Sequence, residues 1–242
     1  MSEYDENQVQ ETALEPAPKN SGKKLAIIGA VVVLVGAIGF GFWTWHETPG
    51  FCAAFCHNMD QYLEGYNQPQ GVAGHDKYGT PVKNTNAMMA VLHRNTKATA
   101  MPEIRCMGCH HPVIGEQISE GIGWALGSYL DPLDERVGED LTHWWGEPAT
   151  NFCANENCHV YLLGSDGLLS HDKLEASTAG RAFNPHAQHH ENLSLQCTDC
   201  HKGHRASTVV CTGCHEHEGI QLPDGWITYE ESEKIMTRMF SA

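Results

Sequence analysis

Basic residues are scarce in this sequence. Its 242 residues include 15 lysines and arginines against 30 aspartates and glutamates, which gives a net charge of −15. Proteins bind phosphate backbones through a cationic surface, which such an acidic chain lacks. Nucleic acid is therefore not an expected partner. The sequence also has no G-x-S-x-G, no P-loop and no G-x-G-x-x-G in a suitable context. Serine-hydrolase, nucleotide and flavin chemistry therefore have no support.

Long hydrophobic runs are missing too, with one exception near the N-terminus. Residues Leu25 to Trp45 contain no charge. At about 1.5 Å per residue, a helix over this run spans roughly 30 Å, the thickness of a bilayer core. A cleaved signal peptide is the alternative, but the run is long for one and no A-x-A-like site follows it. We therefore predict a transmembrane anchor at 25–45.

The distribution of lysines predicts the orientation of this anchor. Lys19, Lys23 and Lys24 precede the run, and no lysine or arginine follows it until Lys77. The positive-inside rule then places residues 1–24 in the cytoplasm, as a disordered polar tail, and 46–242 on the extracytoplasmic side of the cytoplasmic membrane.

No cysteine is left over from a repeated pattern. The ten cysteines form five pairs, and a histidine directly follows the second cysteine of every pair. The pairs and their histidines are Cys52/Cys56 with His57, Cys106/Cys109 with His110, Cys153/Cys158 with His159, Cys197/Cys200 with His201, and Cys211/Cys214 with His215. Two thiols followed by histidine are typical of covalent haem attachment, in which the thiols bind the two vinyl groups and the histidine reaches the iron.

Three of the pairs have the usual two-residue gap, whereas "CAAFCH" has one extra residue and "CANENCH" has two. Only the contact between the second cysteine and its histidine is fixed, so we expect the extra residues to bulge outward. Zinc ribbons also use C-x-x-C but need no histidine after each pair. Disulfides within such short loops would give the histidines after them no role. We predict five covalently bound haem c groups.

Histidines outside the motifs supply candidate second ligands to iron. Eleven remain, which suits bis-histidine ligation of most haems, and such iron transfers electrons rather than binding substrate. We expect His93, His186, His190 and His204 to be ligands, followed by His143 and His171, which lie between motifs. His111 and His217 also fit solvated neighbours of a motif histidine, and His46 a contact with lipid headgroups.

The predicted fold of 46–242 is a mainly α and irregular multihaem cytochrome c domain organised around five haems, with the transmembrane helix before it. Haem faces would supply most of its buried apolar surface. Helical periodicity runs from Ile118 to Leu130, interrupted by glycines that would let a flat ring approach, while packing on the rest of the domain is equally compatible. Thr228 and Glu231 form a candidate capping box for a C-terminal helix, which we expect to pack on the domain.

The N-terminal half resembles a known family. A membrane helix is followed by "CHNM" at 56–59, by His93, and by "CMGCHHP" at 106–112. This order is similar to that of the NapC/NirT/NrfH family of membrane-anchored multihaem quinol dehydrogenases, over roughly residues 20–135. The remainder looks like a multihaem cytochrome of the cytochrome c3-like type, in which sites spaced like that of Cys153 and Cys158 also occur.

The resemblance implies that electrons pass from membrane quinol to the first haem, along the haem chain, and on to a reductase outside the membrane. It implies Met59 as a ligand of the first iron in competition with His57. Two features depart from the family: five motifs replace the usual four, and the pocket lysine after the second motif is missing. Glu116, Glu120 and Asp131 are the acidic candidates there, with solvated carboxylates as the alternative.

The position of the first motif agrees with this function. Cys52 follows Trp45 by seven residues, which span under about 25 Å when fully extended, so the first haem must lie near the bilayer surface. The leading hypothesis is a carrier that links quinol to an extracytoplasmic reductase in anaerobic respiration, with quinol dehydrogenase activity left open. The alternatives are a relay between proteins without quinol oxidation, and an enzyme with an open haem that reduces a small molecule.

Overall fold

A computed structural model describes residues 21–46, 48–55, 59–94, 96, 104–111, 113–129, 135–187, 194–215 and 220–240. The chain divides into two compact units, Met1–Trp45 and His46–Ala242. Each unit is described by itself. Cys56, His57, Asp131, His190 and His217, all named above, lie outside the described residues.

Helix α1, Ser21–His46, makes up the described part of the first unit. Its 26 residues have a length of about 39 Å. It is long and apolar enough to span a membrane, and all side chains from Gly22 to Trp45 are exposed. The helix begins before the apolar run, so Ser21–Lys24, predicted as part of the disordered tail, are helical. Backbone hydrogen bonds continue one turn beyond the apolar residues because nothing in that turn breaks a helix.

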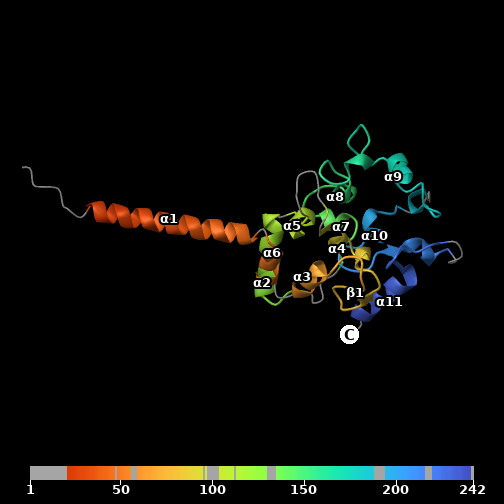
Figure 1. Ribbon diagram of the computed structural model, residues 1–242, viewed down its shortest axis with the longest axis horizontal. Helices are drawn as coiled ribbons and strands as arrows, with labels where there is room; N and C mark the ends of the chain where they lie inside the picture. Colours follow the sequence, from red (N-terminus) through yellow and green to blue (C-terminus); the bar gives the residue numbers. More distant parts are fainter. Residues whose placement is uncertain are drawn as a thin grey trace, which may run out of the picture. The chain divides into compact units, whose positions relative to one another are not determined.

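The second unit consists of short helices joined by irregular segments (Figure 1). Its α-helices are α2 (Pro49–Phe55), α3 (Asp60–Asn67), α4 (Met89–Arg94), α5 (Cys106–Cys109), α6 (Ile114–Ala125), α7 (Glu139–Thr142), α8 (Thr150–Cys153), α9 (His171–Ser177), α10 (Cys197–Cys200) and α11 (Tyr229–Phe240). Its 3-10 helices are η2 (Thr85–Ala87), η3 (Val160–Leu162), η4 (Pro185–Ala187) and η5 (Val210–Gly213). The mainly helical and irregular character agrees with the predicted fold class.

Two pairs of two-residue strands complete the second unit. Strand β1 (Gly74–His75) pairs antiparallel with β2 (Pro81–Val82), and β3 (Thr208–Val209) pairs parallel with β4 (Ile227–Thr228). The β1–β2 turn depends on Asp76, whose carboxylate accepts hydrogen bonds from the backbone of Tyr78 and Thr80 at 2.9 and 2.8 Å. Gly79 takes a φ of 74° in this turn, a conformation that side chains disfavour.

The apolar core among the described residues is small. It consists of Val82, Ala87, Met88, Val91 and Ala206, with Trp226 and Ile227 packed against it. The core therefore joins the segment 82–91 to the segment 206–227, two regions far apart in the sequence. Both regions adjoin histidines that were predicted to bind iron.

The two helices expected from periodicity both form. The capping box of α11 is confirmed: the backbone of Thr228 donates to the Glu231 carboxylate at 2.9 Å, and the backbone of Glu231 donates to the Thr228 hydroxyl at 3.2 Å. Helix α11 packs against η5, β3 and β4, as expected.

Helix α6 has different bounds from the predicted segment, Ile118 to Leu130. It starts at Ile114 and ends at Ala125, before Gly127, whose φ of 69° stops the helix. None of its residues is buried among the described ones, and Ile118 and Ile122 are 58% and 55% exposed. The described part of the domain therefore does not cover its apolar side.

Candidate haem-binding sites

Two of the cysteine pairs each lie on a single helical turn. Helices α5 and α10 are the segments Cys106–Cys109 and Cys197–Cys200 themselves, and η5 carries Cys211. Three residues of helix rotate by nearly a full turn, so both thiols of each pair face the same side. The described cysteines are all unbridged and, apart from Cys214, partly buried.

One backbone hydrogen bond recurs in the four motifs whose histidine is described. The N–H of the histidine donates to the carbonyl of the first cysteine, at 2.7 Å for His110, 3.1 Å for His159, 2.8 Å for His201 and 2.9 Å for His215. This bond holds the backbone of the histidine at a similar position relative to the backbone of the first cysteine in all four motifs. It is kept in the third motif although that motif has two extra residues.

Asn155 explains how the third motif keeps this geometry. Its side-chain oxygen accepts from the backbone of Asn157 at 2.9 Å and of Cys158 at 3.0 Å, and its amide donates to the carbonyl of Asn151 at 2.9 Å. The extra residues fold into a loop closed by this side chain, so Cys153 still receives the His159 bond. The predicted bulge forms in this motif: Glu156 and Asn157 are exposed, whereas Ala154 is buried. The bulge of the first motif lies outside the described residues.

Three motif histidines each lie opposite a histidine from outside the motifs. The ring centres are 6.1 Å apart for His110 and His204, 6.1 Å for His159 and His93, and 6.4 Å for His201 and His186. A metal–nitrogen bond is about 2.0–2.1 Å long and a ring centre lies about 1.2 Å beyond it, so imidazoles on opposite sides of one iron have centres about 6.4 Å apart. The three spacings fit this arrangement.

The hydrogen bond of His93 fixes which of its nitrogens can bind metal. Its Nδ1 lies 2.8 Å from the carbonyl oxygen of Met89, one turn earlier on α4. A carbonyl can only accept, so Nδ1 carries the proton and Nε2 keeps a free lone pair. Such a bond to the remote nitrogen is the usual support of a metal-binding histidine.

His186 reaches the same state through two other side chains. The Asn184 amide donates to the Glu175 carbonyl at 2.9 Å, which leaves its oxygen to accept from the Thr178 hydroxyl at 2.5 Å. Having donated its proton, that hydroxyl accepts from His186 Nδ1 at 3.1 Å. This arrangement favours the tautomer of His186 that has its proton on Nδ1, in which Nε2 is available to a metal.

The surroundings of four of these imidazoles favour the neutral form, which is the form that binds metal. Burial lowers the pKa of His159 and His186, and it lowers the pKa of His201 to about 4. Burial, with His110 and Lys77 nearby, lowers the pKa of His204 to about 3.

Cysteines of successive motifs are close enough to affect one another electrostatically. The neighbouring thiols are Cys52 and Cys106, Cys109 and Cys158, Cys153 and Cys197, and Cys200 and Cys211. Cys153 and Cys197 form a side-chain hydrogen bond, which raises the pKa of Cys153 and lowers that of Cys197 to about 7. The five motifs therefore follow one another in space in the same order as in the sequence.

Other predicted ligands are placed without such a partner. Met59 is partly buried and immediately precedes α3. Among the described residues, His143 has its ring contact with Trp144, at 5.9 Å, and His171 is an exposed residue at the start of α9. Of the acidic candidates, Glu116 and Glu120 both form ion pairs with Arg136.

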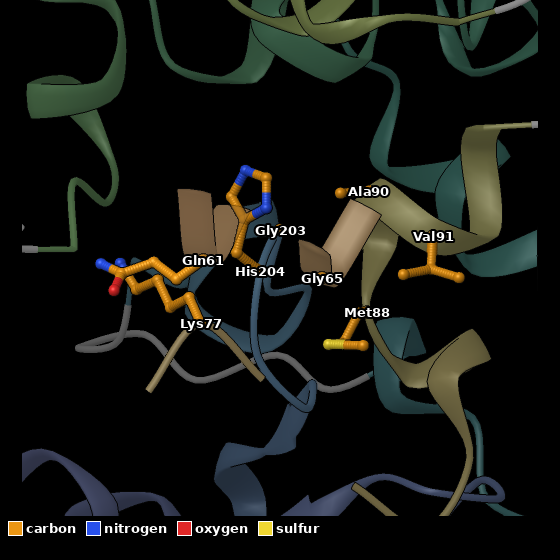
Figure 2. A pocket seen from close by; sticks show the side chains of 8 residues that line it. All are labelled: Gln61, Gly65, Lys77, Met88, Ala90, Val91, Gly203 and His204. Atoms are coloured by element: carbon orange, nitrogen blue, oxygen red, sulfur yellow. The ribbon is translucent and has the colours of Figure 1, made fainter. Parts of the chain in front are cut away.

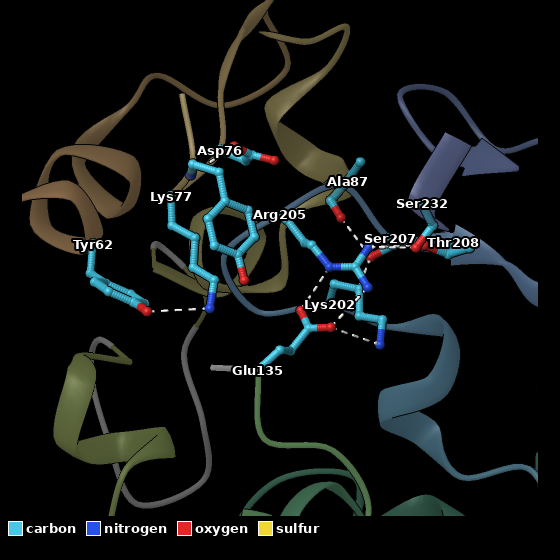
Figure 3. A network of polar contacts seen from close by, with 11 residues as sticks. Tyr62, Asp76, Lys77, Ala87, Glu135, Lys202, Arg205, Ser207, Thr208 and Ser232 are labelled. Atoms are coloured by element: carbon cyan, nitrogen blue, oxygen red, sulfur yellow. Dashed lines mark hydrogen bonds and ion pairs between the residues drawn. The ribbon is translucent and has the colours of Figure 1, made fainter. Parts of the chain in front are cut away.

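A cluster of buried charges near His204 was not predicted from the sequence. Lys77, Lys202 and Arg205 are 7%, 7% and 3% exposed, and the Glu135 carboxylate accepts two hydrogen bonds of 2.8 Å from Arg205 (Figure 3). Burial alone would raise the pKa of Glu135, but Arg205 and Lys202 hold it below its ordinary value. Two of the cations flank His204 in the sequence, and this adjacency is the only sequence signal for the cluster.

A small pocket opens beside the same histidine. It is lined by Gln61, Gly65, Lys77, Met88, Ala90, Val91, Gly203 and His204 (Figure 2). Its lining joins α3 and α4 to the segment after α10. The pocket thus connects the region of the first motif to the His110–His204 pair.

Thiol pairs on helical turns, each followed by histidine, and opposed histidines at metal-ligand spacing are the features of a c-type cytochrome. Comparison with known proteins agrees with this class. The chain is 46% identical over 224 residues to the cytochrome c-type protein Cgr1 of Eggerthella lenta, covering 92% of this chain and 95% of that protein. The chain therefore belongs to the family of cytochrome c-type proteins that includes Cgr1, and covalent haem c and electron transfer follow from that membership. No protein-family model and no solved structure matches the chain.

Proposed function

We propose that this protein is a membrane-anchored pentahaem cytochrome c that takes electrons from quinol at its first haem and delivers them to an extracytoplasmic reductase in anaerobic respiration. The observation that supports it most is the ordered series of five motifs that begins a few residues after an apolar helix. The resemblance to the NapC/NirT/NrfH family agrees with this function.

The ten motif cysteines would hold the haems, and the motif histidines would each supply one axial ligand. His204, His93 and His186 would supply the second ligand opposite His110, His159 and His201, because their ring spacings fit one iron. For the first haem the candidates stay His57 and Met59. His143, His171 and His190 stay candidates for haems without an assigned second ligand.

Haem iron supplies one-electron oxidation and reduction when bound. The opposed histidines would determine how that capacity is used: an iron bound by two imidazoles would have no open position for a substrate. The hydrogen bonds of His93 and His186 hold their rings in one orientation. A pre-oriented ligand needs little rearrangement when the iron changes charge, which suits electron transfer. At the haems of the second, third and fourth motifs, this arrangement argues against the alternative of an open, substrate-binding iron.

The proposed orientation places 46–242 outside the cytoplasm, on the strength of Lys19, Lys23 and Lys24 before the anchor. The order of neighbouring thiols then runs from the first motif in the sequence to the fifth. Cys214 of the fifth motif is exposed, so electrons would leave the protein there.

Reduction by quinol tests the proposal directly. Full-length protein in detergent is mixed anaerobically with a menaquinol analogue, and the haem absorption bands are followed. We expect rapid reduction that a quinone-site inhibitor slows. Haems that dithionite reduces but quinol does not would favour the second candidate, a relay between proteins without quinol oxidation. Absence of covalent haem in a pyridine haemochrome assay would refute both.

Electron delivery to the partner is expected to weaken with salt. Residues 46–242 contain 12 basic and 25 acidic residues, so a partner should dock through a basic surface. Raising the ionic strength from about 0.01 to 0.1 M shortens the Debye length from roughly 30 to 10 Å and should slow association. Transfer rates to the reductase, measured by stopped flow, provide the measurement; rates independent of salt would contradict it.

A further inference from the structure

Buried charges surround the backbone of His204. Lys77 donates its backbone N–H to the carbonyl of His204 at 2.9 Å, and Lys77 and His204 line the same pocket (Figure 2). Lys202 and Arg205 lie two positions before His204 and one position after it. All three cations are less than a tenth exposed, and Lys77 and Glu135 lie close enough to His204 to shift the pKa of its imidazole in opposite directions.

Two carboxylates belong to the same cluster. Glu135 binds Arg205 through two hydrogen bonds of 2.8 Å and lies 3.3 Å from the Lys202 ammonium. Asp76 is 2% exposed and precedes Lys77 directly. The Lys77 ammonium is held at 3.2 Å from the Tyr62 hydroxyl and lies over the rings of Tyr62 and Tyr78 (Figure 3).

Charges in such a place must act on an iron held by His204. Coulomb interactions are several times stronger at a partly buried site than in water, and nearby charge is one of the levers that set haem potentials. A fixed cation disfavours the oxidised iron, which carries one more positive charge, and a fixed anion favours it.

We propose that Lys77 and Glu135 set the reduction potential of the haem held between His110 and His204, in opposite directions. Lys77 raises the potential and Glu135 lowers it by neutralising Lys202 and Arg205. The inference rests on the proposed pairing of His110 with His204. Its consequence is that the second haem in the series, which receives electrons from the first, has a potential tuned by the protein rather than by its axial ligands alone.

Two single substitutions test this proposal through the sign of their effects. In full-length protein, Lys77→Met should lower the potential of one haem and Glu135→Gln should raise the potential of the same haem. We expect each change to alter the one-electron equilibrium constant about tenfold, which corresponds to ~59 mV. Redox titration followed by electron paramagnetic resonance identifies the haem. The imidazole planes of His110 and His204 are 14° apart, and near-parallel planes split the iron d orbitals and give a rhombic low-spin signal.

The exposed pair Lys234 and Glu230, on α11, supplies matched controls. Lys234→Met and Glu230→Gln make the same charge changes in water and should leave every potential unchanged. Shifts of the same sign in Lys77→Met and Glu135→Gln, or no shift in either, would overturn the proposal. If Glu135→Gln fails to fold, Glu135→Asp keeps the charge and should keep the potential, whereas a merely steric role predicts that it shifts.

A further variant separates this proposal from the pairing on which it rests. His204→Ala should make one haem high-spin if His204 is an iron ligand. If that haem stays low-spin, the pairing fails. If it becomes high-spin but Lys77→Met and Glu135→Gln leave the reduction potentials unchanged, the pairing stands and only the electrostatic inference fails.

Discussion

Replacing His93 with alanine is expected to change one haem from low spin to high spin while every haem remains covalently attached. The thiols of the third motif, Cys153 and Cys158, do not depend on His93, so attachment should be complete. The iron opposite His159 would lose its second strong ligand, and an imidazole-only iron has an open position. A high-spin signal in electron paramagnetic resonance and a charge-transfer band in the visible spectrum provide the measurement.

The open position gives this change a functional readout as well. Carbon monoxide should bind the reduced His93→Ala variant at one haem and should not bind the unaltered protein there. His75 supplies the control, because it is a partly exposed histidine that pairs with Glu64 at 3.3 Å and is no candidate ligand. His75→Ala should remain entirely low-spin at this site. A His93→Ala variant with an unchanged spectrum would show that another residue ligates this iron.

Local chemistry made the motifs predictable. A thiol pair and the histidine after it are contiguous in the sequence, and one helical turn is enough to arrange them. The bulge in the third motif was predictable for the same reason, since only the Cys158–His159 adjacency is fixed. The sequence did not indicate that Asn155 would close the bulge, because asparagine has many alternative roles in loops.

The pairing of histidines could not be predicted from spacing. His204 lies three positions after His201, yet the structure places it opposite His110, from a motif far earlier in the chain. His93 likewise precedes the second motif and faces His159 of the third. These contacts depend on the core that joins 82–91 to 206–227, and such tertiary packing has no local signature. The histidines outside the motifs therefore indicated that motif histidines have histidine partners, but not which histidine lies opposite which.

The cluster of buried charges could not be predicted from the sequence for a related reason. Lys77, Glu135 and Arg205 come from three separate segments, and each reads as an ordinary solvated charge in the sequence. Their burial follows from the fold, which brings the segment after α10 against the β1–β2 turn: Lys77 bonds to His204, and Ser207 bonds to Ala87 at 2.9 Å. The same segment carries both a motif histidine, His201, and a candidate second ligand, His204.

Arg205→Met is expected to cause the largest loss of stability of any single substitution in this cluster. The Arg205 side chain is 4% exposed, binds Glu135 through two hydrogen bonds, and donates to Ser232 at 3.0 Å and to Thr208 at 3.3 Å. Methionine fills most of the volume but leaves Glu135 with Lys202 alone. Removing one partner of a buried ion pair costs about 3–5 kcal/mol, because the other charge stays desolvated.

Urea unfolding of the oxidised full-length protein, followed by far-ultraviolet circular dichroism, measures this loss. Lys234→Met provides the control, since its pair with Glu230 is exposed and such pairs contribute little. The double variant Glu135→Gln/Arg205→Met should recover part of the stability, because it no longer buries an uncompensated carboxylate. A loss below about 1 kcal/mol for Arg205→Met would mean that water already solvates Glu135. That outcome would also weaken the electrostatic tuning of the His110–His204 haem, since the same carboxylate would then be screened from the iron.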